Sequence, residues 1–275
     1  MRVLNFVLGK VFDVLFLPFR GLNPWFGMVF ISFLTGLLML FVFSRTSNQT
    51  GIRAVKDRIK AHLLEIRLYK DSLPVQIKAQ GRIILANLRY LSYSLRPMLI
   101  LIIPLLLILA QLNLWFGSRS LRPGEAALIK IYLEKGQNPM DLAIRLDPPP
   151  GLAVETEALR LEDDAEIDWR IRAAGVGLHR LSFRLDGGEF TKTVAVGLSP
   201  LSRVSGLKVS RGLLAEILNP GENPLPSGLP VKRVEVVYPG LKLTALGIGF
   251  PWLVAYFLLS IIFGFALKRP LKVEV

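Results

Sequence analysis

Residues 45–96 read RTSNQTGIRAVKDRIKAHLLEIRLYKDSLPVQIKAQGRIILANLRYLSYSLR. They hold eleven Lys and Arg against three Asp and Glu, and an uncharged apolar run abuts them on each side, at residues 21–44 and 97–118. Each run is long enough to cross about 30 Å of hydrocarbon as an α-helix that rises about 1.5 Å per residue. Because short basic loops stay on the cytoplasmic side of a bilayer, the sequence predicts two transmembrane helices joined by a cytosolic loop.

A third apolar run covers residues 243–267 and is followed by Lys268 and Arg269. Counting spans from the cytosolic loop places the N-terminus outside, residues 119–242 outside and the tail 268–275 in the cytosol. The outside segment carries seventeen Lys and Arg against sixteen Asp and Glu, whereas the loop has an excess of eight positive charges, as the positive-inside bias requires. We therefore expect an integral protein of a bacterial inner membrane, with its N-terminus outside and its C-terminus cytosolic.

Residues 1–20 are mostly apolar, but Lys10 and Asp13 interrupt them and no small-residue cleavage pattern follows. These features disfavour a cleaved signal peptide. They favour an amphipathic helix in the outer membrane interface, with polar side chains toward the headgroups and apolar side chains toward the acyl chains. The polar set is Asn5, Lys10 and Asp13, and the apolar set is Val7, Val11, Leu15 and the phenylalanines.

Within residues 45–96 the apolar side chains recur at steps of three or four in two blocks, which predicts two helices. The segment Asp71-Ser72-Leu73-Pro74 supplies the break, since Ser72 suits a helix N-cap and Pro74 is tolerated in a first turn. We expect a helical hairpin whose two apolar rows face each other as in a coiled coil. The alternative is one amphipathic helix lying flat on anionic lipid. The expected rows are Ile52, Val55, Ile59, Leu63, Ile66 and Tyr69 in the first helix, and Ile77, Gly81, Ile84, Leu88, Leu91 and Leu95 in the second.

Residues 119–242 read as an inserted all-β domain, because short apolar or alternating runs recur between turn signals about every 8–12 residues. The expected strands cover 126–133, 141–146, 154–161, 166–171, 178–185, 189–196 and 231–237. Asp186-Gly187-Gly188 predicts a hairpin turn between two of them. Residues 177–183 resemble the late strand of immunoglobulin-like domains in their alternation, so we expect an immunoglobulin-like sandwich. A short helix at 211–218 and a Pro-rich loop at 219–230 complete the domain.

Little in the sequence supports catalytic activity or metal binding. The chain has no cysteine, which excludes disulfides and thiolate sites, and His62 and His179 fall on opposite sides of the predicted membrane. The acidic residues between Glu162 and Asp168 match no calcium-loop spacing and favour a solvated turn. The high isoelectric point is explained by the basic loop and anionic lipid, so we expect no DNA partner, no cofactor and no enzymatic activity.

The order of these elements resembles the YidC/Oxa/Get/EMC insertase superfamily of membrane proteins. The shared features are an interfacial helix, a first span, a basic cytosolic helical hairpin, a second span that opens at Arg96-Pro97-Met98, and a third span. The chain is most similar to the minimal three-span members, the archaeal YidC-like proteins and the third subunit of the endoplasmic-reticulum membrane protein complex. The resemblance covers residues 1–118 and 243–275. It implies a factor that moves weakly charged segments across the bilayer through a groove open to cytosol and lipid.

The chain departs from this family in two places. Bacterial members place an arginine within the first core span, whereas here the nearest candidate is Arg45 at the cytosolic end of that span. Minimal members have a short outer loop where this chain inserts a domain. Polar side chains inside the spans are costly and tend to face a wet cavity, although ordinary hydrogen bonds between helices also account for them. The groove candidates are Ser32, Thr35, Arg45, Gln111, Asn113, Tyr256 and Ser260.

These features predict an insertase-like factor or intramembrane chaperone whose partners are membrane lipids and nascent or client membrane proteins, with the ribosome as a further candidate. The residues expected to contact client or ribosome are Arg53, Lys56, Arg58, Lys60, Arg67 and Lys70. One competing hypothesis is a membrane-anchored scaffold whose outside β-sandwich recruits an envelope partner. Another is a subunit of a transporter or enzyme complex.

Overall fold

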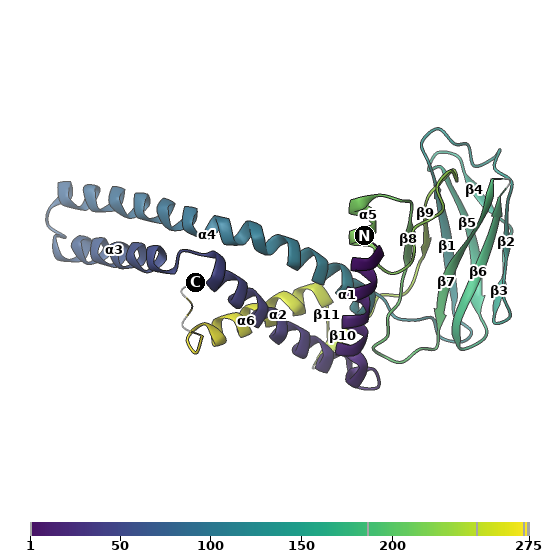
Figure 1. Ribbon diagram of the computed structural model, residues 1–275, viewed down its shortest axis with the longest axis horizontal. Coiled ribbons are helices and arrows are strands. Elements are labelled where there is room, and N and C mark those ends of the chain that lie inside the picture. Colours follow the sequence, from purple (N-terminus) through teal and green to yellow (C-terminus); the bar gives the residue numbers. More distant parts are fainter. Residues whose placement is uncertain (1, 186, 246, 272, 274–275) are drawn as a thin grey trace. The chain divides into compact units, whose positions relative to one another are not determined.

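The computed structural model contains two compact units (Figure 1). The β unit consists of Met1–Gly27 and Leu106–Trp252, and the helical unit of Met28–Leu105 and Leu253–Val275. The structure describes every residue except 1, 186, 246, 272, 274 and 275.

The helical unit is built from long helices that begin and end at identifiable sequence signals. The Asn48 side chain accepts a hydrogen bond from the Gly51 backbone N–H at 2.9 Å and so caps the start of α3. Ser72 directly precedes α4, so the break between α3 and α4 lies where the sequence predicts it. Pro97 and Pro104 lie inside α4 without ending it. The elements are α2 (Pro24–Thr46), α3 (Gln49–Leu68), α4 (Leu73–Phe116) and α6 (Trp252–Lys268).

Two helices, α2 and α4, are long and apolar enough to cross a membrane. α4 has 44 residues and is therefore about 66 Å long at 1.5 Å per residue, about twice the thickness of a hydrocarbon core. One helix thus contains both the second arm of the predicted hairpin and residues 97–116 of the span predicted at 97–118. α6 is a shorter apolar helix of 17 residues.

The third apolar run differs from its prediction, because its first residues are not helical. Leu243–Ala245 and Ile248–Phe250 form β10 and β11, an antiparallel pair, and α6 begins only at Trp252. Gly247 has φ +79°, a left-handed conformation that favours a turn over a helix, and Pro251 then precedes the first helical residue. Apolar composition alone does not distinguish a short strand from a helix.

The apolar rows of the hairpin also differ from their prediction. Ile52 and Val55 of α3 are buried as expected, but the buried residues of the adjoining part of α4 are Ala79 and Ala86. At about 100° per residue, Ala79 lies on the side of α4 opposite to Ile77. α4 thus has two rows of residues with the same spacing, either of which could face α3. The row of small alanines allows the two helices to approach more closely. The predicted row is left more than half exposed, at Ile77, Ile84, Leu88, Leu91 and Leu95.

The N-terminal segment is helical, as α1 (Arg2–Phe16) followed by the single turn η1 (Leu17–Phe19). Contrary to the prediction that its phenylalanines face acyl chains, Phe12 and Phe16 are buried against protein. The Phe16 ring lies 4.7 Å from that of Trp115 and 5.5 Å from that of Phe116, centroid to centroid. The aromatic end of α4 thus fastens α1 within the β unit. Val3, Phe6, Val7, Val11 and Val14 remain exposed on α1.

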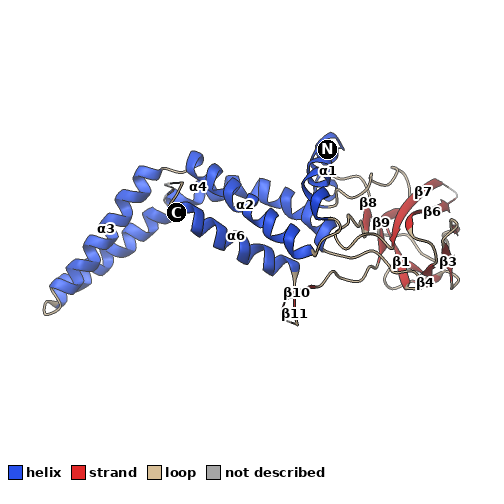
Figure 2. Ribbon diagram, turned by 90° about the horizontal axis from the view of Figure 1, so that it is seen from below, coloured by secondary structure: helices blue, strands red, loops and turns tan. Residues whose placement is uncertain are grey.

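Strands β1 to β9, which are red in Figure 2, form two antiparallel sheets. Both sheets contribute to one shared core. One sheet has the order β3-β5-β1-β9-β8, with β4 also paired to β5, and the other has the order β2-β6-β7. Trp169 of β5 and Phe183 of β6 meet edge to face across this core at 6.0 Å. The strands are β1 (Ala126–Leu133), β2 (Ile144–Asp147), β3 (Leu152–Val154), β4 (Leu159–Leu161), β5 (Glu166–Ala173), β6 (Gly177–Leu185), β7 (Gly188–Val196), β8 (Leu207–Val209) and β9 (Val231–Val236), and the helix α5 spans Leu213–Leu218.

Two details of this sandwich depart from the sequence prediction. The strand expected at 154–161 is two short strands, β3 and β4, and β8 is an additional strand. The predicted hairpin joins β6 to β7, with Leu185 opposite Gly188, although Asp186 of its turn lies outside the described residues.

The acidic segment divides between a turn and a buried charge cluster. Glu162, Asp163 and Asp164 are exposed, as a solvated turn requires, but Glu166 and Asp168 are buried in β5. Lys130 of β1 joins these two carboxylates, at 2.5 Å from Glu166 Oε1 and 3.2 Å from Asp168 Oδ2. Burial, assisted by the neighbouring Glu166, raises the pKa of Asp168 to about 6.

We expect Asp168→Asn to change how stability depends on pH. Because the pKa of Asp168 is raised to about 6 from its ordinary 3.8, the folded state keeps a proton there that the unfolded state releases between these values. Raising the pH through this window therefore lowers the free energy of unfolding. The melting temperature of the wild type, relative to that of Asp168→Asn, should fall between about pH 4 and pH 7.

Asp147→Asn is the matched control, because the Asp147 side chain is 44% exposed and pairs with Arg184 at the surface. Thermal unfolding of the full chain in a neutral detergent measures both variants. A difference between wild type and Asp168→Asn that stays constant with pH would contradict the assignment.

Candidate functional site

α2, α4 and α6 enclose a groove of about 480 Å³ within the helical unit. Most of its wall is apolar, with Leu40 and Phe43 from α2, Met98 and Leu101 from α4 and Ile261 from α6 among the lining residues. Five lining side chains carry a polar group, namely Tyr90 and Ser94 of α4 and Tyr256, Ser260 and Lys268 of α6. The groove is therefore an apolar surface with a few polar positions.

The groove exists because α2 and α6 approach each other closely at small residues. A Cβ atom added to Gly36 would lie 3.2 Å from the backbone O of Ser260 and 3.3 Å from the backbone N of Gly264. Ser32 and Gly36, like Ser260 and Gly264, are four residues apart, and small residues at this spacing let two helix backbones meet. Phe33 and Phe263 flank the contact edge to face, with ring centroids 5.5 Å apart.

Several hydroxyl groups at this contact are buried without a hydrogen-bond partner. Thr35 donates to the backbone O of Ile31 in its own helix at 2.8 Å. Ser32 Oγ, Tyr256 Oη and Ser260 Oγ, in contrast, form no hydrogen bond within ordinary geometric limits among the described residues, although Tyr256 Oη lies close to the hydroxyls of Thr35 and Ser260. A buried polar group without a partner costs about 1–3 kcal/mol, unless water or a bound molecule supplies one. Tyr256 and Ser260 line the groove and give it a capacity for polar contacts.

The sequence-derived groove candidates separate into two sets. Ser32, Thr35, Tyr256 and Ser260 come together where α2 meets α6, and the last two line the groove. Gln111 is buried in the β unit, with its Oε1 unpaired among the residues described. Gln111, Arg45 and Asn113 do not line the groove. Arg45 is exposed, with its guanidinium over the Phe41 ring at 5.2 Å, and Asn113 borders a cavity of about 170 Å³ beside β8 and β9.

The basic residues predicted to contact client or ribosome lie on α3 and the turn that follows it. Lys56 is half-buried, with its ammonium 5.9 Å from the Tyr90 ring centroid. Lys60 pairs with Asp57 at 3.3 Å in an exposed contact that contributes little to stability. The exposed members of the set are Arg53, Arg58, Lys60, Arg67 and Lys70.

Three polar residues that line the groove are absent from the candidates predicted from the sequence. Tyr90 and Ser94 fall within the predicted cytosolic hairpin, yet α4 continues through them to Met98 without a break, and both line the groove. Lys268 was counted only as the end of the third run, although its half-buried ammonium lies 4.6 Å from the Phe265 ring centroid and borders the groove. The spacing of Tyr90, Ser94 and Met98 at four residues on one helix face was the available signal.

No metal centre accompanies the groove. Within the described part of the chain, no three His, Cys, Asp or Glu side chains gather closely enough to hold an ion.

Comparisons with known proteins add little. No family model matches the chain, and no curated protein matches it. Among solved structures, the chain is similar to the crystal structure of the S-layer protein SbsC domains 4 and 5, at 14% identity. That match covers 29% of this chain and 47% of the other chain, and its TM-score of 0.23 is too low to support an argument on fold or function.

We expect Gly36→Leu to force α2 and α6 apart, because any side chain at this position meets the backbone of α6. Overpacking of this kind costs about 1–3 kcal/mol. Gly81→Leu is the matched control, since Gly81 is also helical but has no atom within 4 Å of an added Cβ. Thermal unfolding of the full chain should give a lower melting temperature for Gly36→Leu and an unchanged or higher one for Gly81→Leu. Equal melting temperatures would contradict the close contact.

Proposed function

We propose that the chain is an insertase-like membrane protein in which α2, the apolar half of α4 and α6 cross the bilayer, and the groove among them receives client segments. The observation that carries this proposal is the pair of buried hydroxyls of Tyr256 and Ser260, which line an apolar groove without a geometric hydrogen bond among the described residues. Polar groups inside hydrocarbon are costly and mark functional sites in membrane proteins. A client's own polar groups would supply the missing partners.

The dimensions of the groove support binding of one helix face. Its volume of about 480 Å³ falls within the range of about 300–1,000 Å³ that is typical of ligand clefts. This space holds a few side chains and not a whole helix, so the remainder of a client segment would face lipid. Such partial enclosure lowers the cost of polar groups on one side of the segment and leaves it free to depart sideways.

The hairpin supplies a route toward the groove. The exposed row on α4, from Ile77 to Leu95, includes Leu91, which also lines the groove. An apolar client helix could contact this row first, while the positive charges of α3 attract acidic flanking residues or ribosomal surface. In this proposal the basic residues help to capture client segments, in addition to setting the orientation of the protein in the membrane.

The proposed topology follows the charge distribution, with α3 and the basic part of α4 cytosolic and residues 119–242 outside a bacterial inner membrane. α6 is about 26 Å long at 1.5 Å per residue, and a span of this length requires slight thinning of the bilayer. The outside sandwich has the strand orders β2-β6-β7 and β3-β5-β1. These orders correspond to strands C-F-G and D-E-B of an immunoglobulin domain, which supports the immunoglobulin-like assignment.

Photo-crosslinking from adjacent positions on α6 tests the groove. Ile261 and Ile262 are both exposed isoleucines, at 53% and 59%, but only Ile261 lines the groove. We expect a photoreactive residue at 261 to crosslink nascent membrane segments, and the same residue at 262 to give far weaker products. The difference should persist when residues 122–232 are replaced by a Gly/Ser linker.

Equal crosslinking from both positions, or none from either in the intact protein, would overturn the insertase proposal. The second outcome would favour the scaffold, in which the outside domain recruits an envelope partner and the helices only anchor it. That domain has its own hydrophobic core, so it could perform such a role.

Single cysteines test the orientation against a clean background, because the chain has none of its own. Gln80 is exposed on α4 and Gly187 lies in the β6–β7 turn. In intact cells an impermeant thiol reagent should label Gly187→Cys but label Gln80→Cys only after lysis. Labelling of Gln80→Cys in intact cells would refute a cytosolic hairpin.

A further inference from the structure

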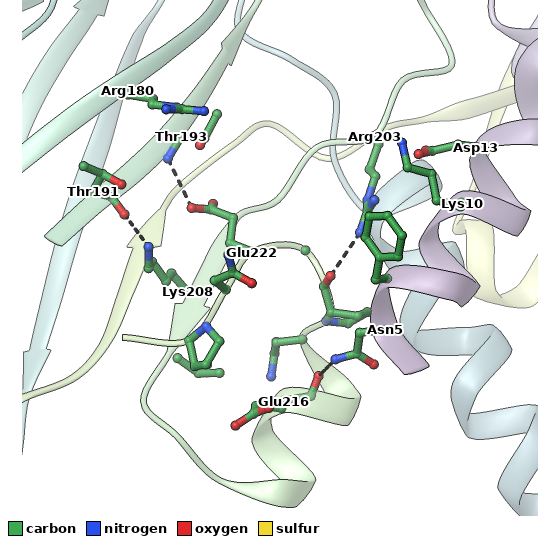
Figure 3. A pocket seen from close by; sticks show the side chains of 17 residues that line it. Asn5, Lys10, Asp13, Arg180, Thr191, Thr193, Arg203, Lys208, Glu216 and Glu222 are labelled. Atoms are coloured by element: carbon green, nitrogen blue, oxygen red, sulfur yellow. Dashed lines mark hydrogen bonds between the residues drawn. The ribbon is translucent and has the colours of Figure 1, made fainter. Parts of the chain in front are cut away.

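The β unit contains a pocket of about 570 Å³ that is distinct in composition from the apolar groove (Figure 3). Its wall is formed by α1, β6, β7, β8 and the segment from α5 to residue 224. Four cationic side chains line it, namely Lys10, Arg180, Arg203 and Lys208. Three carboxylates also line it, namely Asp13, Glu216 and Glu222.

The charge of one of these carboxylates, that of Glu222, is already neutralised by a buried lysine that does not line the pocket. Lys192 of β7 is fully buried and pairs with Glu222 while donating to the backbone O of Ser205 at 2.7 Å. The Thr193 backbone N–H donates to the same carboxylate at 3.3 Å. With Lys192 included, five cations face three carboxylates, so the pocket carries a net positive charge.

Part of this positive charge lacks a partner. Arg203 Nη2 donates to the Pro220 backbone O at 3.0 Å, whereas its buried Nε has no hydrogen-bond acceptor among the described residues. Arg180 has no carboxylate within ion-pair distance in the described part of the chain. Lys208 donates to a neutral carbonyl, the Thr191 backbone O, at 2.6 Å. Burial lowers the pKa of both Arg203 and Lys208, and the nearby carboxylates of Asp13 and Glu222, respectively, offset this effect only in part.

The backbone of α1 closes one side of this site. A Cβ atom added to Gly9 would lie 3.0 Å from Arg203 Nη1, so glycine lets the guanidinium lie directly against the helix. Asn5, one turn earlier, donates from Nδ2 to the Glu216 backbone O at 2.8 Å and ties α1 to α5. Phe6 lines the same pocket and is 66% exposed, which places an apolar surface beside the cations.

We propose that this pocket binds a phosphate group. A phosphate presents several acceptor oxygens in different directions, which suits an arginine fork together with separate ammonium and hydroxyl donors. Two sources share this chemistry, the headgroup of an anionic phospholipid and a soluble phosphate ester. The exposed apolar residues of α1 next to the pocket suit the acyl chains of a lipid. The site belongs to the β unit and does not depend on the proposed insertase function.

Lipid and phosphate binding by the full chain tests this proposal. The protein, purified in a neutral detergent, is titrated with phosphatidylglycerol, with phosphatidylcholine and with inorganic phosphate, and bound lipid is counted by native mass spectrometry. The test variant is Lys10→Gln with Arg180→Gln, which removes two solvent-accessible cations of the pocket. The matched control is Arg184→Gln, because Arg184 lies on the same strand, four residues on, and pairs with Asp147 outside the pocket.

We expect the double variant to bind phosphatidylglycerol at least about tenfold more weakly, as the loss of a charge-assisted contact implies, and the control to bind it like the wild type. Lys10→Arg with Arg180→Lys should restore binding. Weak competition by inorganic phosphate identifies a lipid headgroup as the ligand, and full competition identifies a soluble phosphate ester. Equal retention of phosphatidylglycerol and phosphate by wild type, double variant and control would overturn the proposal, as would a wild type that binds neither. Matching melting temperatures exclude misfolding as the cause.

Discussion

The helical unit depends on the contact at which Gly36 of α2 meets the backbone of Ser260 and Gly264 in α6. Because no side chain intervenes, dispersion contacts between the two backbones replace the ridge-and-groove packing of larger residues. The same small residues leave space beside them, and the larger Leu40, Phe43 and Met98 border that space without filling it. The groove is therefore a direct consequence of the glycine contact, and Tyr256 and Ser260 line it for the same reason.

A second constraint is the continuity of α4, whose 44 residues include two prolines. Proline inside a helix removes one backbone hydrogen bond and usually bends or breaks the helix, yet neighbouring groups compensate this loss in apolar helices. Since the helix does not stop at Arg96, the second arm of the basic hairpin and the proposed second span share one continuous helix. Tyr90, Ser94 and Met98 consequently belong to a single helix face, and a segment bound along α4 would reach the groove without crossing a loop.

The sequence predicted elements better than it predicted which faces they bury. The helix break at Ser72 and most long strands followed from caps, turns and alternation, which are local properties. The face of α4 that packs in the hairpin did not follow from local properties, because the row of Ile77 and the row of Ala79 have equal spacing. Only the partner helix determines which row is buried. The start of α6 was misplaced because a Gly- and Pro-containing apolar strand has the same hydropathy as a span. Lys268 was missed as a groove residue, since nothing in its local sequence reveals what packs beside it.

In each unit, some of the buried polar groups without a hydrogen-bond partner among the described residues lie at a concavity. In the helical unit these are hydroxyls of α2 and α6, and in the β unit, which has further such groups elsewhere, it is the guanidinium of Arg203. Native proteins satisfy nearly all buried polar groups, so such exceptions require a compensating role. Neutral hydroxyls in an apolar groove suit transient contacts with weakly polar segments, because they bind any donor or acceptor modestly. The Arg203 guanidinium, whose burial Asp13 offsets only in part, lies beside other cations and would gain from a bound anion. The two proposed sites would therefore select different partners by charge, which is why the groove and the proposed phosphate pocket require separate experiments.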